Sequence, residues 1–310
     1  DLPFPDDDAY ARYRLGGGAL ARDDWRRNNV DTLVQSMLHT VRSIKPLVRF
    51  GVSPFGVGRP DRRPPGISGF SQFDKLYADV ERWFDNGWLD YLAPQLYWQI
   101  DRAGLQFPVL LDYWLAENRA RRHVWPGLFT SQITRGEPLG PRAWPAREVL
   151  DQVLLQRTRS GTGGTGSSAA TGHIHFSMIA LMQDRDGIAT LLQMGPYVQP
   201  ALVPATPWLA TAAPPAPTLR SSGARVVIEP GAGEAAALWA VWRRAAGVWR
   251  FEVLAGHERS LAPQGADLLA VSAVGRTGNQ SASHMLRLGT AAAPPAPAPS
   301  ATPTPTITPP

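Results

Sequence analysis

Short apolar segments alternate with amphipathic segments through the first two hundred residues of this chain. In the first amphipathic segment, at about 24–44, apolar residues recur at the spacing of one helix face: Val30, Leu33, Val34, Met37, Leu38, Val41 and Ile44. Further helices are expected at about 73–86, 107–118, 145–157 and 187–194. Buried strands are expected at about 47–56, 87–98, 123–129 and 173–181. Because strands that alternate with helices usually pair in parallel under helical cover, this order predicts an α/β fold.

The spacing of these strands is typical of a (β/α) barrel. A complete barrel of eight strand–helix units needs about 250 residues. Only four units precede the composition change after residue 210. The sequence therefore predicts part of a TIM barrel over residues 1–210.

A different pattern follows the segment "PALVPATPWLATAAPPAPTLR". Residues 216–290 alternate apolar and polar positions between turn signals, which predicts a small β-sandwich. Trp239, Trp242 and Trp249 could form a binding face there, but sandwich core is the preferred interpretation. Residues 291–310 are rich in Pro, Ala and Thr and are expected to form a disordered linker or tail.

Composition excludes several classes of function. The net charge is +5, but the arginines are scattered, so acidic or cell-surface partners are expected and nucleic acid is not. The absence of cysteine excludes disulfides, cysteine nucleophiles and thiolate metal sites. No apolar run approaches the roughly 18 residues of a membrane-spanning helix. The chain begins with Asp1 and shows no signal peptide, which we interpret as a processing point or a truncation.

The strand "GWLDYLAPQLYW" (87–98) ends in an amide, a phenol and an indole within four residues. Active-site residues of (β/α) barrels lie at the carboxyl ends of the strands. Indole and phenol rings suit the apolar faces of sugars, and Gln or His can bond to hydroxyl groups. We therefore predict a glycan-binding groove. Its candidate residues are Ser53, Phe55, Gln95, Tyr97, Trp98, Trp125, His173 and His175, with Phe176 beside them.

Each candidate also has a structural interpretation. The aromatic residues could instead close the barrel core. His173 and His175 alternate and should point the same way, but no third ligand lies nearby, so no metal site is predicted. A sugar contact and a structural role both remain open for these two histidines. No cofactor is expected.

Glycoside hydrolysis normally needs two carboxyl groups, and none stands at these strand ends. Asp90 lies at the start of its strand. Asp101 is expected in a solvated loop, and the run Asp6–Asp8 in a cap or exposed loop. Glu117 and Glu148 belong to helices. The glycine-rich loop at 161–172 lacks the ending of a phosphate-binding loop and is interpreted as a flexible connection.

Several sequence blocks resemble the bacterial glycosyl hydrolase-like family 10. They are "FPDDDAYARY", "DDWRRNNVDTLVQ", "KPLVRFGVSPFGV", "LYADVERWFDNGWLDYLAPQLYW", "VWPGLFT" and "GHIHFSM", in the expected order over residues 4–178. The block "LLAVSAVGRTGNQS" also resembles the end of a fibronectin type III domain. Gln95, Tyr97, Trp98 and His175 match strand-end motifs of the family as groove residues.

The resemblance implies the C-terminal half of a (β/α)8 barrel in an extracytoplasmic protein, often a lipoprotein. The family's Asp-Asp-Tyr-Phe-Tyr-Pro motif, which closes its fourth strand, would lie upstream of Asp1 together with any signal sequence. No catalytic carboxylate can therefore be assigned in this chain.

Two functions are expected from these observations. The first is a glycosidase that acts on bacterial cell-wall, peptidoglycan-type glycan in the complete protein, with the present chain an inactive fragment. The second is a non-catalytic extracellular glycan-binding protein.

Overall fold

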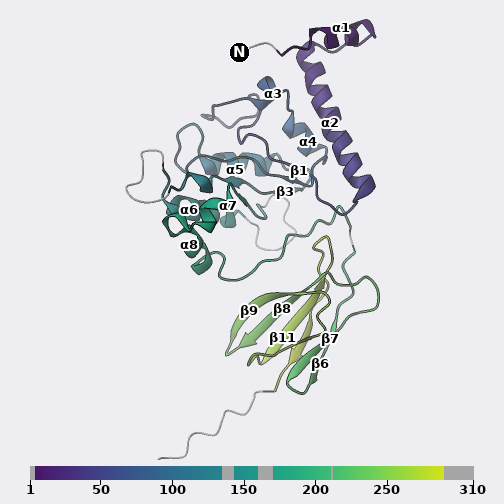
Figure 1. Ribbon diagram of the computed structural model, residues 1–310, viewed down its shortest axis with the longest axis vertical. Coiled ribbons are helices and arrows are strands. Elements are labelled where there is room, and N and C mark those ends of the chain that lie inside the picture. The colour runs from purple at the N-terminus through teal and green to yellow at the C-terminus, as the bar shows by residue number, and fades with distance from the viewer. Residues whose placement is uncertain (1–3, 135–142, 160–169, 211, 290–310) are drawn as a thin grey trace, which may run out of the picture. The chain divides into compact units, whose positions relative to one another are not determined.

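The computed structural model of the chain describes residues 4–134, 143–159, 170–210 and 212–289. The chain divides into two compact units (Figure 1). The first holds residues 1–212 with 276–279, and the second holds residues 213–275 with 280–310. The predicted tail at 291–310 and most of the predicted loop at 161–172 lie outside the described residues.

The first unit combines short parallel strands with helices. Its helical elements are α1 (Asp7–Leu15), α2 (Arg22–Ile44), α3 (Gln72–Lys75), α4 (Val80–Asp85), α5 (Phe107–Ala116), η1 (Thr130–Gln132), α6 (Ala146–Thr158), α7 (Met178–Met182), η2 (Arg185–Gly187) and α8 (Ile188–Met194). Its strands are β1 (Gly51–Val52), β2 (Tyr91–Leu92), β3 (His123–Val124), β4 (Gly127–Leu128) and β5 (Ile174–His175).

The strands follow one another across the sheet in chain order, and every pair is parallel. β1, β2 and β3 form one ladder, and β4 pairs with β5. Single bridges, Phe55 to Gln95 and Gln95 to Gly127, extend the pairing toward the carboxyl ends. The predicted parallel α/β arrangement is therefore present. No further strand pairs with the outer side of β1 or β5 in the described part of the chain.

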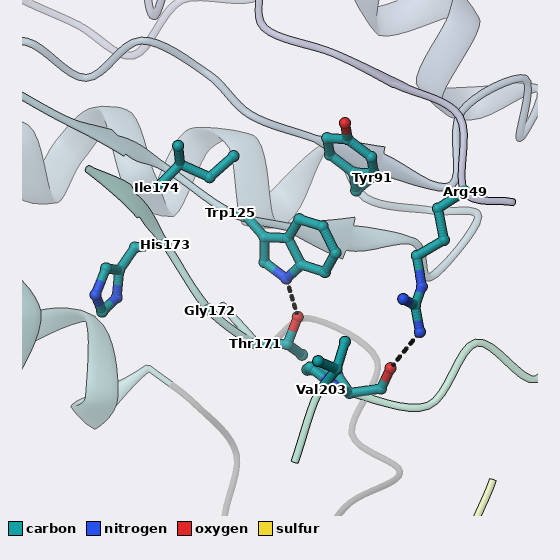
Figure 2. A pocket seen from close by; sticks show the side chains of 9 residues that line it. Arg49, Tyr91, Trp125, Thr171, Gly172, His173, Ile174 and Val203 are labelled. Atoms are coloured by element: carbon teal, nitrogen blue, oxygen red, sulfur yellow. Dashed lines mark hydrogen bonds between the residues drawn. The ribbon is translucent and has the colours of Figure 1, made fainter. Parts of the chain in front are cut away.

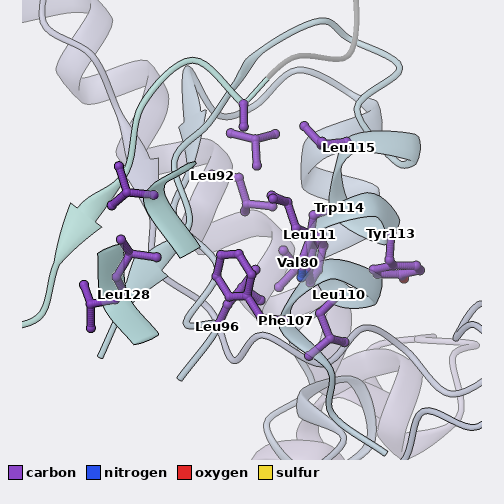
Figure 3. Packing of buried hydrophobic residues seen from close by; sticks show 14 of the residues in the cluster. Val80, Leu92, Leu96, Phe107, Leu110, Leu111, Tyr113, Trp114, Leu115 and Leu128 are labelled. Atoms are coloured by element: carbon purple, nitrogen blue, oxygen red, sulfur yellow. The ribbon is translucent and has the colours of Figure 1, made fainter. Parts of the chain in front are cut away.

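One face of this sheet is packed against helices. Leu92, Val124 and Leu128 are fully buried there, in the same hydrophobic core as the side chains of α5. Figure 3 shows Leu92 and Leu128 in this cluster. Trp114 of α5 is also fully buried, and its indole nitrogen donates to the carbonyl of Gly56 at 2.8 Å, so no polar group in this ring is left unpaired. We call this the helix-facing side of the sheet and the opposite side its inner face.

The predicted helix at 73–86 is interrupted. α3 ends at Lys75 and α4 begins at Val80. Between them Tyr77 has φ of 54°, and a left-handed residue cannot continue a right-handed helix. The guanidinium of Arg26, on α2, lies 4.8 Å from the centre of the Tyr77 ring. Gly87, with φ of 66°, follows α4 and ends it as predicted.

Other boundaries also differ from the sequence prediction. The strand predicted at 173–181 ends at His175, and Met178 begins a helix. The strand predicted at 123–129 is divided at Pro126, which cannot donate a ladder hydrogen bond. α1 was not predicted. The apolar stripe of α2 is largely uncovered in the described residues, where Val34 is buried but Leu33 and Met37 are exposed.

The second unit is built from antiparallel strands. They are β6 (Thr218–Ser222), β7 (Arg225–Glu229), β8 (Leu238–Ala245), β9 (Val248–Ala255), β10 (Ser260–Leu261), β11 (Leu268–Val274) and β12 (His284–Arg287). One sheet has the order β10-β7-β6 and the other β12-β11-β8-β9. Their shared core includes Ile228, Trp239 and Val271. This confirms an antiparallel, all-β unit, and its likeness to a fibronectin type III domain stays a prediction.

The three tryptophans of β8 and β9 do not share one environment. Trp239 is buried and donates to the carbonyl of Glu258, whereas Trp242 is 39% exposed and lies against Phe251. The interpretation of all three as core is therefore wrong for Trp242. Because successive side chains point to opposite faces of a sheet, Trp239 and Trp242, three residues apart, lie on opposite faces.

Candidate functional site

The inner face of the parallel sheet carries five of the residues predicted to form the groove. Side chains alternate along a strand, so positions an odd number of residues away from the half-buried Val52 and the buried Leu92 and Val124 point to the inner face. These positions are Ser53, Phe55, Gln95, Tyr97 and Trp125. The bridges of Gln95 to Phe55 and to Gly127 place these strands in one continuous row.

A cluster of aromatic rings lies at the carboxyl end of this face. The Tyr97 ring stacks on Phe129 at 4.9 Å between centroids and on Phe176 at 5.3 Å. Gly127 makes room for it, because a Cβ there would lie 3.1 Å from Tyr97 Cε1. Phe129 was not among the predicted residues. Its place two positions after Gly127 on the same strand segment was the signal that could have found it.

Two polar groups in this cluster have no hydrogen-bond partner in the described part of the chain. Gln95 donates through Nε2 to the Ser53 carbonyl at 2.9 Å, and no donor within the described residues bonds to its Oε1. The Tyr97 hydroxyl is the second group. Burial raises the pKa of Tyr97, so the phenol stays neutral and can both donate and accept.

A cavity of about 470 Å³ lies on the same face toward the amino ends of the strands (Figure 2). Its wall is formed by Arg49, Tyr91, Trp125, Thr171, Gly172, His173, Ile174, Val203 and Pro204. The rings of Tyr91 and Trp125 stack at 4.7 Å, and the Trp125 indole nitrogen donates to Thr171 Oγ1 at 2.9 Å. Arg49 is held by the Pro204 carbonyl and by Thr206.

The two histidines make their hydrogen bonds on the other side of the sheet, although His173 also borders this cavity. His175 is the register partner of Leu128, so its side chain lies on the helix-facing side, while Phe176 next to it points to the inner face. His173 contacts Gln156 of α6, and both imidazoles contact the hydroxyl of Tyr197. Burial lowers the pKa of His173 to about 3 and that of His175 to about 4, so both rings are neutral at physiological pH. Their geometry fits the structural interpretation better than a shared groove with Gln95.

Trp98 is also separated from its neighbour. Its ring packs against the hydrophobic core on the helix-facing side, and its carbonyl accepts a hydrogen bond from Gln152 of α6 at 3.1 Å. The structure therefore places Gln95, Tyr97 and Trp125 together on the inner face and Trp98 on the helix-facing side.

The acidic residues considered from the sequence serve other contacts. Asp90 is buried and accepts hydrogen bonds from Arg42, the Phe50 amide and Trp208. Asp6 accepts hydrogen bonds from Nε and Nη2 of Arg26.

The remaining acids are likewise accounted for. Glu148 Oε1 accepts from the Ile100 amide and Glu117 pairs with Arg62, whereas Asp101 is exposed in a turn. Within the described residues no group of three potential ligands could hold a metal ion, and no helix is long and apolar enough to cross a membrane.

The inner face therefore combines aromatic rings with an amide and a phenol at the carboxyl ends of sequential parallel strands. Residues 3–141 match the model of the family Glycosyl hydrolase-like 10. The chain is 36% identical over 222 residues to "Glycosyl hydrolase YngK" of Bacillus subtilis (strain 168), which covers 70% of this chain and 41% of that protein. It is 43% identical over 112 residues to "Glycosyl hydrolase DigH" of Escherichia coli (strain K12), or 35% of this chain and 25% of that protein.

These matches confirm the predicted similarity to glycosyl hydrolase-like family 10. The chain spans less than half the length of the curated relatives it matches. More than half of the sequence of each relative named as a hydrolase therefore has no counterpart in this chain.

Proposed function

We propose that the first unit is half of a (β/α)8 glycosidase barrel and that its inner face holds part of a glycan. The observation that carries the proposal is the placement of Gln95, Tyr97 and Trp125 on the sheet face opposite the one that packs against α5. Sequential parallel strands are the arrangement that closes into such a barrel when four more units are added. The names and the greater length of the similar proteins agree with this.

The residues of the inner face have distinct tasks in this proposal. The rings of Tyr97, Phe129 and Phe176 form a platform for the apolar face of a sugar ring. The free Oε1 of Gln95 accepts a hydrogen bond from a sugar hydroxyl, and the Tyr97 hydroxyl provides a second contact. Neutral groups of this kind orient a glycan but cannot cleave it.

Hydrolysis needs two carboxyl groups that flank the glycosidic bond, one as acid and one as base or nucleophile. In this proposal they belong to the other half of the barrel. The substrate we propose is bacterial cell-wall, peptidoglycan-type glycan, and the protein is extracytoplasmic.

The experiment compares binding and cleavage of purified peptidoglycan glycan strands by the protein that contains this chain. Tyr97→Ala should weaken binding about tenfold or more, because a stacking ring and a hydroxyl are both lost. Trp249→Ala in the second unit is the matched control and should bind like the parent. Equal affinity of the Tyr97 variant and the parent would refute the proposal.

A non-catalytic glycan-binding protein is the second candidate. The inner face favours it in one respect, since the described residues place amide and phenol groups there without a carboxylate. Release of reducing ends from the glycan strands distinguishes the two: release identifies a glycosidase, and retention without release identifies a binding protein.

A further inference from the structure

A line of five side chains crosses the helix-facing side at the ends of β4 and β5. His173 Nδ1 lies 2.7 Å from Gln156 Oε1, and His173 Nε2 contacts the Tyr197 hydroxyl. The same hydroxyl lies 2.9 Å from His175 Nε2, and His175 Nδ1 lies 2.7 Å from Thr130 Oγ1. Tyr197 therefore joins two histidines whose remaining ring nitrogens are also occupied.

Only one neutral arrangement of protons satisfies these contacts. Gln156 Nε2 donates to the Gly172 carbonyl, so Gln156 Oε1 must accept and His173 must carry its proton on Nδ1. His173 Nε2 is then an acceptor, and the Tyr197 hydroxyl donates to it. His175 must in turn donate from Nε2 to the Tyr197 oxygen, which leaves its Nδ1 to accept from Thr130. The Thr130 hydroxyl then gives its one proton to His175 at 2.7 Å and not to the Leu128 carbonyl at 3.4 Å.

Two members of this line are adjacent in sequence to two rings of the aromatic platform. His175 precedes Phe176, and Thr130 follows Phe129, and these two rings stack with Tyr97 on the opposite side of the sheet. We infer that Tyr197 is a positioning residue: its hydroxyl fixes His173 and His175 in opposite tautomers and thereby sets the spacing of the platform. This inference rests on the proposed function for its consequence in glycan binding.

The charged surroundings favour the neutral state. Arg157 of α6 is a cation near the pair, and its guanidinium donates to the Pro196 carbonyl next to Tyr197. Burial of the ring lowers the pKa of His173, and the neighbouring His175 and the charge of Arg157 act in the same direction. The Tyr197 hydroxyl stays protonated, because burial raises its pKa to about 12. No tautomer change is therefore expected between pH 5 and 8.

The test is imidazole nitrogen NMR on the protein that contains this chain. The parent should show neutral His173 protonated on Nδ1 and neutral His175 protonated on Nε2. Tyr197→Phe should abolish this pairing of tautomers, shift the ring-proton signals of Phe129 and Phe176, and weaken glycan binding roughly threefold to tenfold, the effect of one hydrogen bond. Tyr10→Phe is the matched control. It also removes one tyrosine hydroxyl, which donates to the Leu20 carbonyl and is remote in sequence from His173 and His175.

Gln156→Glu provides a second test that does not depend on the stability of the phenylalanine variant. The carboxylate still accepts from His173 Nδ1 but stabilises the imidazolium, so the pKa of His173 should rise into the neutral range. A cationic His173 cannot accept from Tyr197. Glycan affinity should then fall as the pH drops below this new pKa, whereas the parent shows no such step.

Any one of three results would overturn the inference. The first is identical tautomers for the two histidines in the parent, and the second is unchanged Phe129 and Phe176 signals in Tyr197→Phe. The third is a glycan affinity of Gln156→Glu that does not change with pH. If the parent binds no glycan, the proposed function fails, and the tautomers and ring signals still decide whether Tyr197 positions the platform.

Discussion

The phenol ring of Tyr91 occupies the space that a side chain on Gly51 would fill. The two residues are register partners on β2 and β1, and a Cβ built on Gly51 would lie 2.5 Å from Tyr91 Cε2. The ring therefore lies across the neighbouring strand and reaches Trp125 on the other side. The glycine on β1 thus decides how the wall of the amino-end cavity is built.

Gly51→Ala should destabilise the first unit by about 1–3 kcal/mol, because the Tyr91 ring has to leave its place against Trp125. Chemical denaturation followed by tryptophan fluorescence measures the change. Gly289→Ala is the control, since no atom lies within 4 Å of the added Cβ. Equal unfolding midpoints for the Gly51 variant and the parent would contradict this reading of the strand contact.

Gly127→Ala tests the aromatic platform without removing any of its members. The new Cβ would lie 3.1 Å from Tyr97 Cε1 and 3.5 Å from the Pro94 carbonyl, so the ring has to move by a few tenths of an ångström. We expect weaker glycan binding with a stability change of less than about 1.5 kcal/mol. Calorimetric titration with glycan oligosaccharides measures the first quantity, and an unaltered affinity would argue against a role for the Tyr97 position.

Trp239 and Trp242 should respond differently to truncation. Trp239→Ala removes a buried ring from the sandwich core and should cost about 3–5 kcal/mol. Trp242→Ala should cost clearly less, because 39% of its side chain surface is already exposed. Thermal unfolding of the two variants gives the comparison, and similar losses would mean that Trp242 is covered in solution.

Glu81 should make stability depend on pH. It is fully buried, its Oε1 accepts from the Tyr113 hydroxyl at 2.6 Å and from the Arg59 amide at 2.8 Å, and burial raises its pKa. A raised pKa means that the folded state holds the proton more tightly than the unfolded chain. Its stabilising effect is therefore complete below the unfolded value and is lost as the pH rises through the folded value.

Glu81→Gln removes this titration and keeps an oxygen acceptor. The free energy of unfolding of the parent should fall relative to that of the variant as the pH is raised from 4 to 8. Denaturant titrations at several pH values test this, and a constant difference between the two proteins would exclude a raised pKa at Glu81.

Asp6→Asn should loosen α1. Asp6 bonds to Arg26 of α2 at 2.6 and 2.7 Å, and these bonds hold the pKa of Asp6 below its ordinary value. Loss of the charge should therefore increase hydrogen exchange of the α1 amides. Asp8→Asn, at an exposed position, is the control, and equal exchange in both variants would show that the Asp6 pair does not hold the helix.

The alternation of apolar strands and amphipathic helices was enough to predict the parallel sheet and its chain-order arrangement. The segment predicted as a strand at 87–98 is shorter in the structure, where β2 covers only Tyr91–Leu92. Its burial is nevertheless predictable, because Leu89, Leu92 and Leu96 are apolar and are removed from water in any fold. The break at Tyr77 could not be predicted in this way. It depends on the left-handed backbone there and on the position of Arg26, which is remote in sequence.

The arrangement of some candidate residues follows from the sequence, and their role in glycan binding stays a prediction. Gln95, Tyr97 and Trp125 lie on the inner face because the period of a strand is two, and that period is visible in the sequence. The same rule applied to "HIHF" could not decide which side faces the helices. Only the register of His175 with Leu128 settles this, and it directs the histidines to Tyr197 and leaves Phe176 on the platform.

The sequence by itself determined the class of fold, the division into an α/β and an all-β unit, and the chemical character of the strand ends. These follow from local periodicity and composition, which act over a few residues. The tertiary structure alone decided which side each strand end faces and which polar groups are already bonded. Those properties depend on pairing between segments far apart in the chain, where a shift by one residue turns every side chain to the other face.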